Sequence, residues 1–196
     1  SPVVISSLEY FSMQIDAQKT AIQNFLDLIN FDNATALTEA EVSIGVPAAW
    51  DDGNGGATND RNSIVTLSAV ADSGYAGTVD IRYYRLDVDV IKTNAAITLE
   101  RTLTQSSTLT TVRDALATQL GVIADQVELQ DELGAALTEL PTMAEGETAT
   151  VYLGAIDGSL TYFGSTAATL SPYVDPDTQL DEEVTTTDAS GFDYPA

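Results

Sequence analysis

The side chains best suited to bind a ligand lie in a polar, glycine-rich stretch, residues 51–60 (DDGNGGATND). Its carboxylate and amide oxygens are the ligands that a hard cation such as Ca²⁺ prefers. The stretch departs from the EF-hand pattern, because no Glu follows at the required spacing and Gly56 stands at a ligand position. It also differs from a phosphate-binding loop, since no Lys-Ser or Lys-Thr pair follows the glycines. The sequence favours a flexible connection here, with cation binding as the alternative.

The chain lacks the residues that most enzymes use for nucleophilic and acid–base catalysis. It has no His and no Cys, so the commonest general base, thiolate nucleophiles and disulfides are all excluded. Asp181, Glu182 and Glu183 form a carboxylate cluster, but they stand in an acidic run without a nucleophile nearby. We therefore expect no enzymatic activity, no catalytic residues, no cofactor and no metal that folding requires.

Four charged residues crowd one predicted strand: Arg82, Arg85, Asp87 and Asp89. They could form a docking patch for another subunit, which makes Arg82 and Arg85 candidate interface residues. The alternative is cross-strand ion pairing on a solvated face, which contributes only about 0.2–1 kcal/mol per pair. The sequence favours ion pairing over docking.

The charge of the chain is strongly negative and unevenly distributed. The formal net charge is −23, and residues 114–196 carry 16 acids and no base. Such a surface repels phosphate backbones and anionic lipid, so we expect no direct contact with nucleic acid and none with membranes. Solubility alone is the other explanation for the charge. The first residues lack the basic segment of a signal peptide, which predicts cytosolic synthesis without export.

The elements that position these residues centre on a predicted β-hairpin over residues 64–90. One face of its first strand carries Val65 and Leu67, and one face of its second carries Val79, Ile81 and Tyr83. From Tyr84 onward the apolar residues change face, and the set becomes Tyr84, Leu86, Val88 and Val90. A slip of one residue in a period of two predicts a β-bulge in the second strand. The turn between the strands contains two glycines, in residues 72–77.

Two amphipathic helices are predicted, at residues 16–30 and 108–120, with strands at 42–46 and 97–103 and a second hairpin at 146–170. After each helix a similar segment follows, LTEAEV at 37–42 and VIADQV at 122–127. This similarity indicates either a duplicated helix–loop–strand unit, with halves 16–90 and 91–170, or a chance match. The predicted fold class is α+β, with antiparallel β-hairpins, two packed helices and extended terminal arms.

The arms are residues 1–15 and the acidic residues 171–196. Holding about 26 such residues in place needs extensive contact, because ordering one residue costs roughly 1–2 kcal/mol of backbone entropy. We therefore expect the arms to lie on other subunits, with Tyr173, Leu180, Phe192 and Tyr194 buried in partner grooves.

Five stretches carry a resemblance to a known family: FLDLIN (25–30), LTEAEV (37–42), RNSIVTL (61–67), DSGYAGTV (72–79) and YRLD (84–87). Together they resemble a group of uncharacterised virion structural proteins of large tailed bacteriophages, over roughly residues 20–170. The SGYAGTV turn and the YRLD strand are the most specific matches.

The resemblance implies a virion component, made in the host cytoplasm, that contacts copies of itself and a major capsid or tail protein. The acidic surface favours capsid decoration, and a tail, neck or baseplate position is the alternative within that class. A carbohydrate- or receptor-binding β-module is the second hypothesis. It requires aromatic side chains grouped over a cleft, and the candidates are Trp50, Tyr75, Tyr83 and Tyr84.

Overall fold

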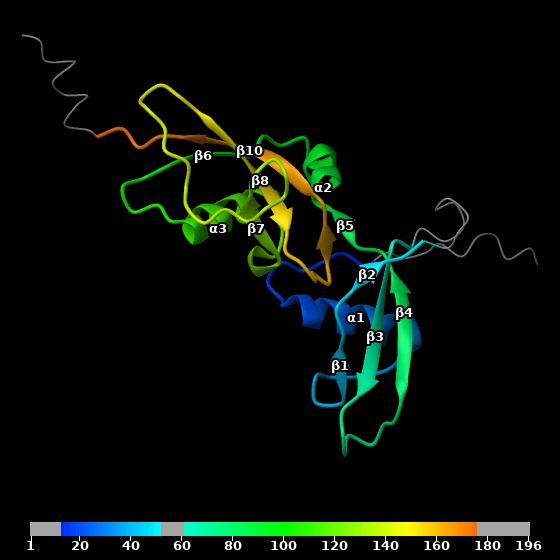
Figure 1. Ribbon diagram of the computed structural model, residues 1–196. Helices are drawn as coiled ribbons and strands as arrows, with labels where there is room; N and C mark the ends of the chain where they lie inside the picture. Colours follow the sequence, from blue (N-terminus) through cyan, green and yellow to red (C-terminus); the bar gives the residue numbers. More distant parts are fainter. Residues whose placement is uncertain (1–12, 52–60, 176–196) are drawn as a thin grey trace, which may run out of the picture.

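The computed structural model of the protein describes residues 13–51 and 61–175, which form two lobes along an elongated molecule (Figure 1). The N-terminal lobe contains α1 (Ala21–Asn33), β1 (Val42–Ile44), β2 (Ala48–Ala49), β3 (Ser63–Ala69) and β4 (Thr78–Tyr83). The C-terminal lobe contains α2 (Val88–Ala95), β6 (Glu100–Thr102), α3 (Leu109–Leu120), the short 3₁₀ helix η1 (Ala124–Gln126), β7 (Val127–Gln130), β8 (Ala149–Ala155) and β10 (Ser165–Ser171). A ribbon of β5 (Leu86–Asp87) and β9 (Tyr162–Phe163) links the lobes. The α+β prediction is confirmed.

The first predicted helix exists, but both of its predicted ends are wrong. Thr20 caps the helix: its side chain accepts a hydrogen bond from the Gln23 backbone N–H, and the Gln23 side chain accepts one from the Thr20 backbone N–H. Asp16 lies before this cap, where its backbone N–H donates to Asn24 Oδ1 at 2.7 Å. At the other end α1 continues past Asn30, whose side chain instead binds the backbone of Leu37.

The second predicted helix is confirmed as α3. Thr108 caps it in the same manner as Thr20 caps α1, and Gly121 ends it in the left-handed conformation at φ 75°. Val112, Leu116, Ala117 and Leu120 form its buried stripe.

The long hairpin of the N-terminal lobe is confirmed as β3 and β4, paired from Ser63–Tyr83 to Ser68–Thr78. Val65 and Leu67 are buried, and Tyr83 packs edge-on against Phe25 of α1 with ring centroids 5.0 Å apart. The predicted β-bulge after Tyr83 is wrong. The strand ends there, because Asp87 caps α2 and the fully buried Val88 begins that helix. The sequence analysis missed α2, since eight residues are too few to separate a helical period from an alternating one.

A β-bulge does occur, on the opposite edge of the same sheet. Ile44 lies opposite Leu67 and Ala48 lies opposite Ile64, so residues 45–47 face the two β3 residues 65–66. This edge therefore has one residue more than β3 over the same stretch. The last of the three residues is the buried Pro47, which a sheet tolerates only at an edge or a bulge.

The second hairpin is also confirmed, as β8 paired with β10 in a sheet of order β6-β10-β8-β7. The strand predicted at 97–103 is shorter, Glu100–Thr102, and runs parallel to β10. Ser171 belongs to β10 and accepts a hydrogen bond from Leu103, so the predicted arm boundary at 171 is wrong. At the other end Ile15 packs against the core, so this part of the predicted N-terminal arm lies on its own domain.

The two helix–turn–strand units share one backbone hydrogen bond in their turns. Glu41 N–H donates to the Thr38 carbonyl at 3.0 Å, and Gln126 N–H donates to the Ile123 carbonyl at 3.1 Å. A buried valine, Val42 or Val127, then starts an antiparallel strand. The predicted boundary between residues 90 and 91 falls inside α2, so the halves are not divided there. Duplication stays a hypothesis.

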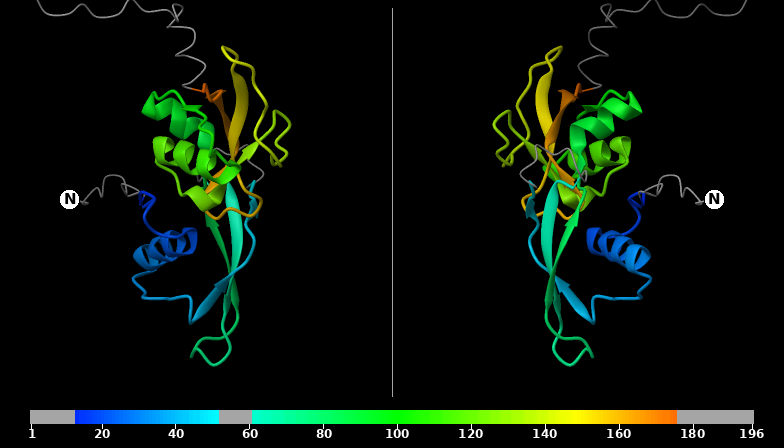
Figure 2. Two further views of the ribbon diagram at one scale, coloured as in Figure 1. Left: turned by 90° about the vertical axis from the view of Figure 1, so that its left-hand side faces the viewer. Right: turned by 90° about the vertical axis from the view of Figure 1, so that its right-hand side faces the viewer.

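The helices lie on one side of the strands in both lobes (Figure 2). A single cluster of buried apolar residues runs through the two lobes, from Phe25 and Val65 to Leu153 and Leu170. The β3–β4 hairpin extends beyond this core and ends in an exposed turn that carries Tyr75.

Tyr83 provides a test of this packing. Its side chain is 5% exposed, and its hydroxyl has no hydrogen-bond partner among the described residues. Tyr83→Phe removes this unpartnered group and keeps the ring on Phe25. We expect the free energy of unfolding at pH 7 to rise by about 1 kcal/mol, measured by thermal melting.

The pH dependence separates this effect from a general change in packing. Burial raises the pKa of Tyr83 from 10.0 to about 12, with a smaller opposing effect of Arg85. The folded state therefore keeps the proton while the unfolded chain loses it, and stability falls as the pH rises from 10 through 12. The advantage of Tyr83→Phe should grow over that interval. An advantage that stays constant from pH 7 to pH 12 would contradict the assignment.

Candidate functional site

Arg85 lies where the two lobes meet, and its guanidinium donates hydrogen bonds to groups of the same chain. Nε donates to the buried Ser63 Oγ at 2.6 Å, and Nη1 donates to the Ser159 carbonyl at 3.0 Å. The backbone of Arg85 is bound by Asn62, which accepts at 2.8 Å and donates at 2.9 Å. One side chain thus ties β3 of the N-terminal lobe to the segment that precedes β9.

The hydrogen bonds continue into the C-terminal lobe. The buried Ser159 donates from Oγ to Gln126 Oε1 at 2.9 Å and accepts from the Tyr162 backbone at 3.1 Å. Tyr162 Oη in turn accepts from the Ile123 backbone, also at 3.1 Å. We call the set Asn62, Ser63, Arg85, Gln126, Ser159 and Tyr162 the junction network. The sequence analysis singled out only Arg85 of these, because isolated polar residues give no periodic signal.

The other three charged residues near Arg85 have separate partners. Arg82 lies over the Trp50 ring, 4.4 Å from its centroid. Asp87 accepts from the Asp89 backbone at the start of α2, and Asp89 accepts from Thr166 Oγ1 at 2.7 Å. Within residues 61–175, Arg82 and Arg85 make no ion pair with Asp87 or Asp89. The predicted ion-pair pattern is therefore absent there, and a direct subunit contact through Arg82 stays a prediction.

The remaining interface candidates lie at the C-terminus. Tyr173 follows β10 and is 41% exposed, which leaves it accessible to a neighbouring subunit. Leu180, Phe192 and Tyr194 lie outside the described residues, as do residues 52–60 of the candidate cation loop.

The aromatic residues proposed for carbohydrate binding do not gather. Tyr83 is buried, whereas Tyr75 is exposed at the tip of the hairpin and Tyr84 is exposed at its base. The six residues of β4 separate the last two by roughly 20 Å, at about 3.3 Å per residue. Trp50 is covered by Arg82.

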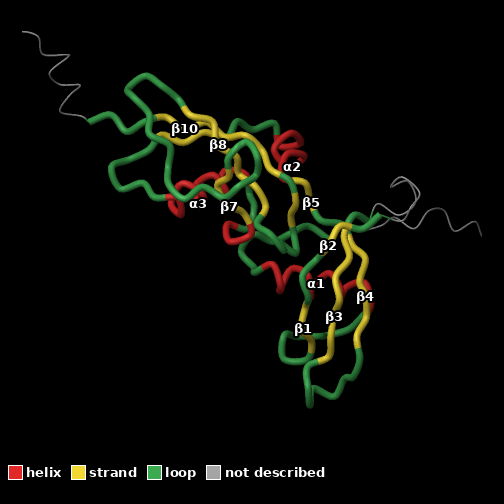
Figure 3. The backbone as a smooth tube through the Cα atoms, viewed as in Figure 1, coloured by secondary structure: helices red, strands yellow, loops and turns green. Residues whose placement is uncertain are grey.

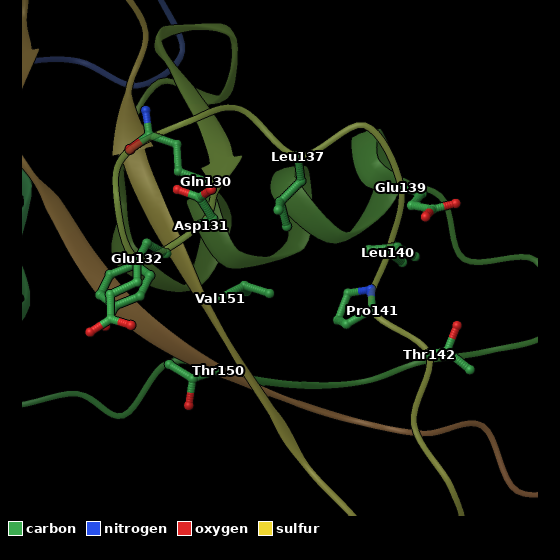
Figure 4. Close-up of a pocket in the computed structure, with 11 residues that line it drawn as sticks. Gln130, Asp131, Glu132, Leu137, Glu139, Leu140, Pro141, Thr142, Thr150 and Val151 are labelled. Atoms are coloured by element: carbon green, nitrogen blue, oxygen red, sulfur yellow. The ribbon is translucent and has the colours of Figure 1, made fainter.

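A groove of about 500 Å³ lies on the C-terminal lobe, under the segment that follows β7 (Figure 4). Leu137, Leu140 and Val151 supply its apolar lining, and Glu132 and Glu139 stand at its rim. Asp131 is occupied in its own turn, where it accepts from the backbone of residues 133 and 135. The groove has the character of a weak contact surface for a basic or apolar segment. The sequence analysis did not single it out, although Asp131 and Gly134 are residues typical of a turn.

Within the described ranges 13–51 and 61–175, no three acidic side chains come together as metal ligands. Over the same ranges no helix is long and apolar enough to cross a membrane.

We expect thermal melts with and without a chelator to superimpose, because carboxylates are the only strong metal ligands in the sequence and their spacing in residues 51–60 is poor. A fall of several degrees in the melting temperature on chelation would show that a metal stabilises the fold.

Substitution of Arg85 tests the junction network. Arg85→Ala leaves Ser63 Oγ without its donor and the Ser159 carbonyl without its partner, so we expect a loss of about 2–4 kcal/mol in unfolding free energy. Arg85→Lys should recover less than half, because an ammonium group does not span both acceptors as the guanidinium fork does.

The matched control is Arg82→Ala, which removes one cation–π contact and should cost at most about 1 kcal/mol. Denaturant unfolding measures all three variants. Equal losses for Arg85→Ala and Arg82→Ala would refute a special role for Arg85.

Comparison with known proteins adds one finding. No curated protein and no solved structure matches the chain significantly. One family model matches residues 15–196, which is most of the sequence. The chain therefore belongs to the DUF7941 family, a family of unknown function.

Proposed function

We propose that the protein is a structural component of a tailed-bacteriophage virion, and that it decorates the head through repeated subunit contacts. It has no catalytic role in this proposal. The main support is the sequence resemblance over residues 20–170 and the position of its two most specific stretches. SGYAGTV forms the exposed end of the hairpin, and YRLD supplies Arg85 and the β5 strand at the junction.

These positions suit a protein that works by contact. The YRLD segment fixes the two lobes to each other, so the hairpin extends from a rigid base. At its end Tyr75 and Val79 are 56% and 53% exposed. Exposed apolar side chains on a projecting element are typical of protein–protein contacts.

The charge favours the outer surface of a head over a position beside packaged DNA. The net charge of −23 repels the phosphate backbone, so a layer that faces solvent avoids this cost. A tail, neck or baseplate position is the alternative within the same class, and the charge argument applies less strongly there.

A carbohydrate- or receptor-binding module is the competing class. It needs a cleft lined by aromatic rings, and the candidate rings are spread between the two ends of the hairpin or buried. This spacing makes the hypothesis the weaker one.

Purified particles of the phage that encodes the chain provide the test. Mass spectrometry should detect the protein at a copy number that follows the symmetry of the head, and cryo-electron microscopy should place it on the outer capsid surface. Absence from purified particles would refute the virion role, and density in the tail would refute head decoration.

Truncation tests the contribution of the C-terminal arm. Deletion of residues 176–196 retains all of β10, including the bond from Leu103 to Ser171. We expect the melting temperature of the isolated protein to change by less than about 2 °C, and incorporation into particles to fall several-fold. The matched control is deletion of residues 171–196, which also removes Ser171 and should lower the melting temperature. If the shorter deletion unfolds the protein, the arm belongs to its own core.

A further inference from the structure

The sheet of the N-terminal lobe has two edges with different properties. The edge formed by β1 and β2 is interrupted by the bulge at residues 45–47 and by Pro47, and both features hinder pairing with another strand. The other edge is β4, six residues without a bulge, proline or glycine. Among the described residues β4 pairs only with β3, so its outer edge carries no strand (Figure 3).

The register of the hairpin identifies which β4 groups face outward. Ala69 N–H donates to the Gly77 carbonyl, so residues 77, 79 and 81 direct their backbone groups toward β3. Gly45 N–H donates to the Thr66 carbonyl on the far side of β3, which agrees with this alternation. Thr78, Asp80 and Arg82 therefore present their N–H and C=O groups at the open edge.

We propose that this edge pairs antiparallel with β4 of a second copy of the chain, with Ile81 at the two-fold axis. Only residues whose backbone groups face outward can form hydrogen bonds across this edge. The possible registers therefore differ from one another by shifts of two residues, and only a few are available. With Ile81 on the axis, Asp80 lies opposite the partner's Arg82, and Arg82 opposite the partner's Asp80. A shift in either direction sets Asp80 against Asp80 or Arg82 against Arg82.

The side chains of β4 fit this register on both faces of the sheet. Opposite residues in such a pair have Cβ atoms about 4.5–5.5 Å apart, so the two acid–base pairs are within contact distance. On the other face, Val79, which is 53% exposed in the single chain, lies opposite the partner's Tyr83, of which only 5% is exposed, so the preference for this register depends mostly on the charged face. Thr66 binds Asp80 through Oδ1, and the Arg82 guanidinium lies 4.4 Å from the Trp50 ring centroid, so both contacts are made by side chains and leave the outward backbone groups of β4 unpaired among the described residues.

The distribution of charge is compatible with this pairing. All seven basic residues lie in residues 1–113, whereas residues 114–196 carry only acids. The described chain ends at residue 175, at the end of the molecule far from β4 (Figure 1). Pairing through β4 thus joins the N-terminal lobes and keeps the described acidic residues of the C-terminal lobes apart. The inference is independent of the virion role, because it concerns the isolated chain.

Hydrogen exchange of the unmodified full chain gives a direct test. Amide exchange measured by NMR at about 0.15 M salt, from roughly 20 μM to 1 mM protein, covers the range expected for a small interface. The Asp80 and Arg82 amides should gain protection as concentration rises, while Val79 and Ile81 are already protected by β3. Absence of any concentration-dependent protection at Asp80 and Arg82 up to 1 mM overturns the proposal.

Charge reversal tests the register by analytical ultracentrifugation. Asp80→Arg and Arg82→Asp each create two like-charge contacts across the axis and should weaken dimerisation about tenfold or more. The double variant Asp80→Arg/Arg82→Asp restores both pairs and should recover most of the affinity. Glu139→Arg, the same kind of charge change on the exposed rim of the groove, should leave dimerisation within about twofold.

Circular dichroism melts check that each variant is folded. If a variant is not folded, the hydrogen-exchange experiment on the unmodified chain decides the question in its place. Single reversals that leave the dimer intact, or a folded double variant that stays monomeric, exclude this register. Protection of Asp80 and Arg82 only on addition of a different protein would assign the edge to another partner and overturn self-pairing.

Discussion

The hydrogen bonds of Arg85 are the interaction on which the arrangement of the two lobes depends. They connect Ser63 in the N-terminal sheet with Ser159, 74 residues farther along from Arg85. Both serines are buried, and a buried polar group without a partner costs about 1–3 kcal/mol. Arg85 thus satisfies one buried group on each side of the junction, so any movement that separates the lobes leaves at least one of these groups without its partner.

The junction also fixes the base of the β3–β4 hairpin, which projects beyond the core. The base of β4 is fixed by Tyr83 against Phe25, and the next residues enter the junction. Toward the tip the side chains become exposed, and no strand within residues 13–51 and 61–175 pairs with the outer backbone edge of β4. A rigid base with an open edge loses little conformational entropy when another strand binds, which favours specific pairing over loose association.

Charge and composition are compatible with the proposed role in protein–protein contacts. The absence of His and Cys removes the commonest general base and the thiolate nucleophile. The polar side chains of the junction network are engaged in hydrogen bonds within the protein. What the described surface offers is an exposed hairpin, an acidic-rimmed groove and Tyr173 beside the last strand. These surfaces suit repeated subunit contacts, in which a weak interface acts many times within one assembly.

The sequence by itself determined the local elements: the α+β class, both hairpins and the presence of α1 and α3 follow from periodicity. Thr108 and Gly121 also fix the ends of α3, whereas the predicted ends of α1 were wrong. Tertiary structure decided where strands end and which edge is open. The alternation from Tyr84 to Val90 suits a strand, yet burial of Val88 and the Asp87 cap make it a helix. The bulge at residues 45–47 and the bonds of Arg85 depend on partners far away in the chain. Local sequence patterns do not predict such partners, because the free energy of burial and hydrogen bonding depends on the residues that pack nearby in space.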